Sequence, residues 1–209
     1  MTQNINKEYS YLALGDSYTI GEKVNQVESF PFQAVAMLQE KGIHFQPPQV
    51  IATTGWSTDE LATAIEKATL RESYDFVTLL IGVNDQYRGR PASLYPAAFE
   101  SLLERAIGLA GNDASKVAVL SIPDWGVTPF AEGRDRRQIA LEIDEYNRIN
   151  QRLAQKYRVA YIDVTPATRR AAKEADLLAE DGLHPSGRAY AEWAGWLASL
   201  IATRVGIKG

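Results

Sequence analysis

Short apolar segments alternate with longer segments of helical periodicity along this chain. The most constraining is residues 75–81, DFVTLLI, a nearly continuous apolar run that ends at Gly82. A run of this kind is typical of a central parallel strand that is buried on both faces. The other apolar runs predict strands at residues 9–14, 50–52, 117–122 and 159–164.

Helices are predicted around these strands. Ser57-Thr58-Asp59-Glu60 is a capping-box sequence, with Ser57 as N-cap and Glu60 at N3. Pro185 is expected at the first position of the last helix, where proline is favoured. The apolar periodicity predicts helices at residues 30–41, 57–71, 94–110, 136–157 and 185–205.

Repeated strand–helix alternation indicates an α/β fold. We expect a three-layer α/β/α sandwich with a five-stranded, parallel, flavodoxin-like sheet, because right-handed crossovers leave few other topologies. A length of 209 residues suits a single domain over residues 1–209. Ligands of such sheets bind beyond the carboxyl ends of the strands. Polar residues and glycines do follow the predicted strands, at residues 15–17, 55, 82–85, 123–125 and 181–184.

These segments contain the parts of an acyl-transfer site. A serine hydroxyl such as that of Ser17 is a poor nucleophile until a base takes its proton, which His184 can do near neutral pH. Asp181 stands three residues before His184 and can accept the other ring N–H. The oxyanion would need donors, for which the candidates are the backbone N–H groups of Ser17 and Gly55 and the side-chain amide of Asn84.

The same segments, in this order and spacing, resemble the conserved blocks of the SGNH (GDSL) hydrolase superfamily. The resemblance extends from residue 9 to about residue 200 and rests on Gly15-Asp16-Ser17, Gly55, Gly82-Val83-Asn84-Asp85 and Asp181-Gly182-Leu183-His184-Pro185. It implies the SGNH hydrolase fold, Ser17 as nucleophile, and Asp181 and His184 as the rest of a triad. It also implies an oxyanion hole formed by Ser17, Gly55 and Asn84.

Two positions depart from the usual blocks. Tyr18 stands where leucine is usual, and this position is expected to point away from the chemistry. Thr54 precedes Gly55 where asparagine is often found, which affects the geometry of that loop. Asp16 and Asp85 are expected to order their own loops by hydrogen bonds rather than to react.

The aromatic residues after the strands have two interpretations. They could seal the upper core, or they could form the wall of a substrate pocket. Connections after the strands are short, and the longest, residues 123–135, carries several charges. No apolar lid is therefore expected, and short acyl chains should be preferred. The aromatic residues concerned are Trp56, Tyr87, Trp125 and Phe130.

The favoured function is a serine esterase that hydrolyses short-chain esters through an acyl-enzyme, with a small-molecule ester as substrate and no cofactor or metal. A sugar O-acetyl esterase or a thioesterase would use the same mechanism. One alternative is a metal-dependent phosphoesterase, in which carboxylates at the strand ends hold Mg²⁺. Another is a binding module without turnover. The carboxylates in question belong to Asp16, Asp85, Asp124 and Asp181.

Composition limits the other partners. With 22 basic and 26 acidic residues the net charge is −4, which gives no electrostatic reason to expect nucleic acid binding. Cysteine is absent, which excludes disulfides and a cysteine nucleophile. No apolar run reaches the roughly 18–20 residues of a membrane span. Residues 1–8 are polar, unlike a signal peptide, so a cytoplasmic location is expected. The sequence does not indicate an oligomeric state.

Overall fold

The apolar runs form one parallel sheet in the computed structural model, which describes residues 7–205. The strand order β2-β1-β3-β4-β5 is that of flavodoxin-like sheets and confirms the predicted fold class. Residues 1–6, on which much of the expected cytoplasmic location depends, lie outside the described residues. The strands are β1 (Tyr11–Gly15), β2 (Gln49–Ala52), β3 (Phe76–Leu80), β4 (Val117–Leu120) and β5 (Ala160–Ile162).

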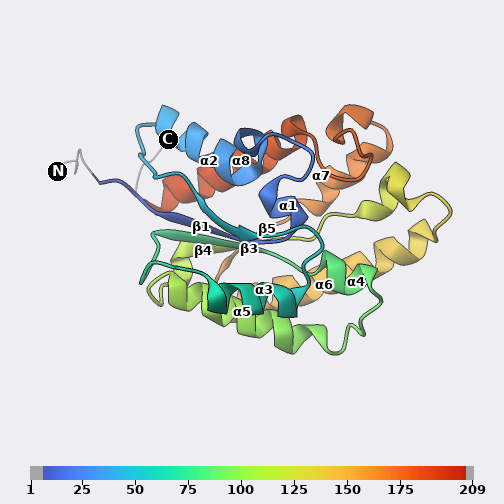
Figure 1. The fold of residues 1–209 in the computed structure, drawn as a ribbon, viewed down its shortest axis with the longest axis horizontal. Coiled ribbons are helices and arrows are strands. Elements are labelled where there is room, and N and C mark those ends of the chain that lie inside the picture. The colour runs from blue at the N-terminus through green and yellow to red at the C-terminus, as the bar shows by residue number, and fades with distance from the viewer. Residues whose placement is uncertain (1–6, 206–209) are drawn as a thin grey trace.

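Helices cover both faces of the sheet (Figure 1). The helices on one face are α1 (Ser17–Ile20), α2 (Phe30–Glu40), α7 (Thr165–Arg169) and α8 (Gly187–Arg204). Those on the other face are α3 (Thr58–Lys67), α4 (Val83–Tyr87), α5 (Tyr95–Leu109) and α6 (Arg136–Tyr157). Short 3₁₀ helices complete the connections, among them η3 (Trp125–Val127), η4 (Pro129–Ala131), η5 (Arg170–Ala172) and η6 (Ala175–Leu177).

The position of each strand explains its hydrophobicity. Every residue of β1, β3 and β4 is buried, which for β3 confirms the prediction from its continuous apolar run. The residues of β2 and β5, the two edge strands, are half-buried. Leu14 of β1 pairs with Ile51 on one side and with Leu79 on the other. This register brings the carboxyl ends of neighbouring strands to a common edge.

One predicted helix start is wrong. Pro185 does not occupy the first helical position of α8, which begins at Gly187. Ser186 is the N-cap, and its hydroxyl accepts a hydrogen bond from the backbone N–H of Ala189. The cap therefore overrides the preference of proline for the first turn. The predicted capping box of α3 is confirmed, since the Glu60 carboxylate accepts from the Ser57 backbone N–H at 2.9 Å.

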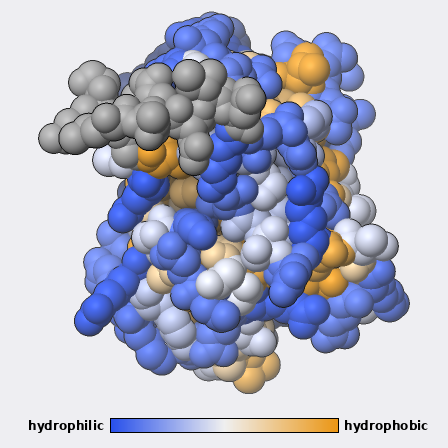
Figure 2. Space-filling view, turned by 90° about the vertical axis from the view of Figure 1, so that its left-hand side faces the viewer, coloured by the Kyte–Doolittle hydropathy of each residue, from blue (hydrophilic) through white to orange (hydrophobic). Residues whose placement is uncertain are grey.

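The surface at the amino ends of the strands is mainly hydrophilic. Figure 2 shows this face, on which hydrophobic residues lie in small, separate groups. Between residues 7 and 205, none of the helices combines the length and the apolar character that crossing a membrane requires. The cavity that contains Ser17 lies at the opposite, carboxyl edge of the sheet.

Candidate active site

Ser17 lies just beyond the carboxyl end of β1, where it is the first residue of α1. The Asp16 carboxylate caps α1 by accepting a hydrogen bond from the Tyr18 backbone N–H at 3.0 Å, which confirms the predicted role of Asp16. Gly15 is required before it, because a Cβ there would lie 2.1 Å from Thr19 Oγ1 and 2.5 Å from the Leu80 carbonyl oxygen. The strand and the short helix can therefore meet closely, with Ser17 held at their junction.

Asp16 is itself fully buried beside the nucleophile. Burial, helped by the nearby Asp85 carboxyl and opposed by the Tyr18 N–H, raises its pKa to about 8. One of its oxygens, Oδ2, has no hydrogen-bond partner among the described residues. A neutral carboxyl is therefore favoured here at neutral pH, which spares the Ser17 environment a second negative charge.

Asp181 and His184 share one tight turn before α8. The Asp181 Oδ1 accepts from the backbone N–H groups of Leu183 and His184, both at 3.0 Å. Gly182 adopts φ +65° in this turn, a conformation that glycine reaches without strain. These backbone bonds orient the carboxylate so that its second oxygen, Oδ2, lies 2.6 Å from His184 Nδ1.

The same histidine reaches Ser17. His184 Nε2 lies 2.9 Å from Ser17 Oγ, and both side chains are buried. Burial raises the pKa of Asp181, but hydrogen bonds from the His184 side chain and the turn backbone outweigh it and hold the pKa below its usual range. An ionised carboxylate can only accept, so Nδ1 carries the proton and Nε2 is free to accept from the Ser17 hydroxyl. The arrangement can move a proton from Ser17 to the imidazole.

Three groups near Ser17 could donate to an oxyanion. Ser17 opens α1, and the first N–H groups of a helix have no acceptor within the helix. Gly55 follows β2 with φ +83°, and no protein atom lies within 4 Å of where its Cβ would be. Asn84 Nδ2 donates to the Trp56 carbonyl at 2.9 Å. This bond uses one of the two amide hydrogens and leaves the other for a ligand.

A tight turn explains the position of Asn84. Gly82 has φ +126°, and a Cβ there would lie 2.3 Å from Tyr95 Oη. The turn starts α4 directly after β3 and places Asn84 in its first turn, half-buried. Asp85 holds this helix to α3 by accepting from Thr58, from its N–H at 3.0 Å and its hydroxyl at 2.8 Å. The predicted loop-ordering role of Asp85 is confirmed.

Ser17, His184 and the oxyanion candidates Gly55 and Asn84 line one cavity, which has a volume of about 140 Å³. Asp181 does not line it, because it lies behind His184. Of the four predicted aromatic wall residues, Tyr87, Trp125 and Phe130 line this cavity. Trp56 does not, and its assignment to the wall is wrong. Its side chain borders a separate groove over α3. Only its backbone carbonyl faces the site, where it accepts from Asn84 Nδ2.

A second expectation, for the direction of the Tyr18 side chain, is also wrong. This side chain does not point away from the chemistry, because it lines the cavity and its ring centroid lies 5.4 Å from that of His184. The sequence carried one signal for this role, namely an aromatic side chain in place of leucine beside the serine. Gln86 was also missed; its Oε1 accepts from Trp125 Nε1 at 2.8 Å and fixes that ring in the wall. The remaining lining residues, also missed, are Thr54, Val83 and Leu183.

The structure contradicts the shared metal site of the phosphoesterase alternative. Within residues 7–205, no group of three or more His, Cys, Asp or Glu side chains is arranged to hold a metal ion. Each aspartate has its own partners instead. Asp124, for example, accepts from Arg169 Nε at 2.8 Å and from the Gly126 N–H at 2.9 Å.

Comparison with known proteins finds a family profile that covers most of the chain. The sequence profile of the GDSL-like lipase/acylhydrolase family matches residues 13–192, which is most of the chain. A search of curated protein sequences finds no match.

Solved structures share the fold at low sequence identity. A lipase/acylhydrolase from Enterococcus faecalis is 20% identical with a TM-score of 0.75, covering 96% of this chain and 99% of its own. The acetylxylan esterase Axe2 from Geobacillus stearothermophilus is 19% identical with a TM-score of 0.70, covering 99% and 98% respectively. TesA is 17% identical with a TM-score of 0.67, covering 94% and 98%.

Proposed function

Because this chain belongs to the GDSL-like lipase/acylhydrolase family and is an ester-hydrolysing enzyme, we propose that it is a serine esterase acting through Ser17, His184 and Asp181. The observation that carries this proposal is the unbroken relay from Asp181 Oδ2 through the imidazole to Ser17 Oγ, with separations of 2.6 and 2.9 Å. We also propose that residues 1–209 act as a single domain.

The reaction has two halves. Ser17 Oγ attacks the ester carbonyl while His184 Nε2 takes its proton, and Asp181 stabilises the resulting imidazolium. The oxyanion accepts hydrogen bonds from the Ser17 and Gly55 N–H groups and from the Asn84 amide. His184 then returns the proton to the departing alkoxide, which leaves an acyl group on Ser17. Water, activated by the same imidazole, releases the acid and restores the serine.

Labelling with a fluorophosphonate tests the nucleophile and its activation together. The phosphonyl group should attach to Ser17 Oγ, as located by mass spectrometry of the digested protein. Exposed Ser199 on α8, which lies outside the cavity, serves as the internal control. Labelling elsewhere, or none in a folded protein, would contradict the proposal.

Asn84 gives a second test. Replacing it with alanine should reduce kcat by about 10²–10³, the usual effect of losing one oxyanion donor. KM should change much less, because the oxyanion forms only on the way to the transition state. Steady-state kinetics separates these effects, and a melting curve shows whether loss of the bond to the Trp56 carbonyl has loosened the loop. An unchanged kcat would assign Asn84 to loop structure alone.

The size of the cavity predicts short acyl chains. Each methylene gains about 0.8 kcal/mol only while it is buried, and the cavity of about 140 Å³ must also hold the ester group. We therefore expect kcat/KM for nitrophenyl esters to be highest between acetate and butyrate. It should be lower for chains of roughly ten carbons or more. A value that still rises beyond the medium-chain esters would contradict this preference.

The cavity mouth favours a sugar acetate as one such substrate. Tyr87 and Phe130 are 42% and 45% exposed there, with ring centroids 6.1 Å apart. Exposed aromatic faces of this kind can pack against the apolar face of a sugar ring. The structurally similar Axe2 is an acetylxylan esterase. Acetylated xylo-oligosaccharides should then be hydrolysed with a higher kcat/KM than ethyl acetate, which also has an alkyl alcohol as leaving group, and the reverse order would favour a simple alkyl ester.

A further inference from the structure

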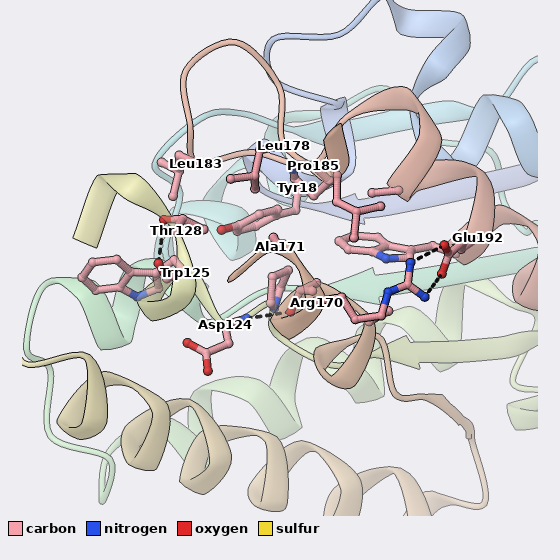
Figure 3. A pocket seen from close by; sticks show the side chains of 16 residues that line it. Tyr18, Asp124, Trp125, Thr128, Arg170, Ala171, Leu178, Leu183, Pro185 and Glu192 are labelled. Atoms are coloured by element: carbon pink, nitrogen blue, oxygen red, sulfur yellow. Dashed lines mark hydrogen bonds and ion pairs between the residues drawn. The ribbon is translucent and has the colours of Figure 1, made fainter. Parts of the chain in front are cut away.

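A second cavity lies directly behind the one that contains Ser17. Tyr18, Trp125 and Leu183 line both cavities and so form the partition between them. The second cavity has a volume of only about 20 Å³, room for about one water molecule. Figure 3 shows Tyr18 in this cavity, with Ala171, Leu178 and Pro185 around it.

The walls of the second cavity are mainly apolar. The buried carboxylate among them, that of Asp124, is paired with Arg169 Nε at 2.8 Å. Ala171 comes from η5, Leu178 follows η6, and Ala189 belongs to the first turns of α8. At the rim, Arg170 Nη2 and Glu192 Oε1 form an ion pair at 2.6 Å (Figure 3), so these charges are directed at each other. The space behind Tyr18 is therefore suited to a hydrocarbon chain and not to a charged group.

Tyr18 is the residue of this partition whose side chain separates the two cavities. Its side chain is 3% exposed, and its backbone is fixed by the bond from its N–H to the Asp16 carboxylate. Trp125 is held in place by Gln86, and the Leu183 N–H is held by Asp181. Substitution of Tyr18 would therefore open the partition with the rest of the wall still in place.

The geometry also indicates which part of the ester faces this partition. The proposed oxyanion donors Gly55 and Asn84 follow β2 and β3. Trp125 follows β4, which lies beyond β3 in the strand order, away from β2. The leaving oxygen must face His184 Nε2, which returns its proton. The partition of Tyr18, Trp125 and Leu183 gives this side of the cavity an apolar wall, which suits the acyl chain better than the oxyanion.

We propose that the ring of Tyr18 ends the acyl-chain site, and that the apolar cavity behind it accepts the continuation of a longer chain when a smaller residue stands at position 18. This inference rests on the proposed esterase function and assigns its chain-length limit to one side chain.

The test is the ratio of kcat/KM for nitrophenyl octanoate to that for nitrophenyl butyrate. Each methylene that becomes buried is worth about fourfold in kcat/KM, the equivalent of about 0.8 kcal/mol. Tyr18→Ala should therefore raise the ratio at least tenfold over the wild type. Tyr18→Phe, which keeps the ring, should leave the ratio within about twofold. A purely structural role for Tyr18 would lower both rates together and leave the ratio where it was.

Two further variants make the result specific. In the Tyr18→Ala background, Ala171→Leu refills the second cavity and should reverse most of the gain. Tyr18→Leu, a milder change, should raise the ratio in the same direction and replaces Tyr18→Ala if that variant does not fold. An unchanged ratio in the folded variants would overturn the inference.

Two controls separate this inference from the function on which it depends. Acetate esters of alcohols of increasing length should show no comparable gain in Tyr18→Ala; a gain confined to that series would overturn the assignment of the cavity to the acyl chain. If the folded wild type neither hydrolyses esters nor takes the fluorophosphonate at Ser17, the esterase proposal itself fails. If the wild type is active and only the ratio is unmoved, the esterase proposal stands and the role of Tyr18 is wrong.

Discussion

Replacing Ser17 with alanine should reduce kcat by about 10⁴-fold or more, because the attacking atom is removed. The fold should persist. Ser17 Oγ is hydrogen-bonded to His184 Nε2, and loss of that bond should cost only about 1 kcal/mol of unfolding free energy. Rates measured on purified protein, together with a thermal melt, would show a folded and inactive variant.

The matched control is the same substitution at an exposed serine of α8. Ser199→Ala should leave kcat within about twofold, because this side chain is exposed on α8 and does not line the cavity. Residues that act as one unit also have non-additive effects, so Ser17→Ala combined with His184→Ala should be little worse than Ser17→Ala alone. Retention of more than about 1% of kcat in Ser17→Ala would contradict the assignment of the nucleophile.

The arrangement of layers was predictable because it depends on long-range hydrophobic pattern. The continuous apolar run of β3 predicted its burial on both faces, whereas the edge position of β2 emerges only from the structure. Short elements were not predictable, since α1 and α4 have four and five residues, too few for helical periodicity to show. The start of α8 was misjudged at Pro185, where the hydrogen bond to the Ser186 hydroxyl decided the boundary.

The proximity of Asp181 and His184 was predictable for a local reason. Only two residues lie between them, and a turn of that length brings the carboxylate to the imidazole while its backbone hydrogen bonds form. The directions of Tyr18 and Trp56 were not predictable. Each depends on where a neighbouring helix begins, and a shift of one residue turns a helical side chain by about 100°. Pocket walls are therefore harder to read from sequence than triads.

Replacing Asp181 with asparagine should reduce kcat by about 10⁴-fold while the turn stays formed. The amide oxygen of asparagine can still accept from the Leu183 and His184 N–H groups, as Asp181 Oδ1 does. Its NH₂ group, however, would face Nδ1 and donate to it. That favours the tautomer with the proton on Nε2, so the Ser17 hydroxyl would lose its acceptor.

The stability of this variant should depend on pH in a defined direction. Burial raises the pKa of Asp181, but its hydrogen bonds lower it more, so the folded pKa lies below that of the unfolded chain. Such a group stabilises the fold above its unfolded pKa, and the contribution is lost as the pH falls through the folded value. Asp181→Asn should therefore melt below the wild type at neutral pH, with the difference shrinking in acid.

Glu180→Gln is the matched control, since it removes an exposed carboxylate one residue away. Both variants change the net charge by the same amount, so any general electrostatic effect on the histidine should appear in both. Only Asp181→Asn should lower kcat by orders of magnitude, because only its carboxylate lies 2.6 Å from His184 Nδ1. A loss of less than about tenfold in Asp181→Asn would mean that the turn backbone alone orients the imidazole, and that the carboxylate is not part of the catalytic relay.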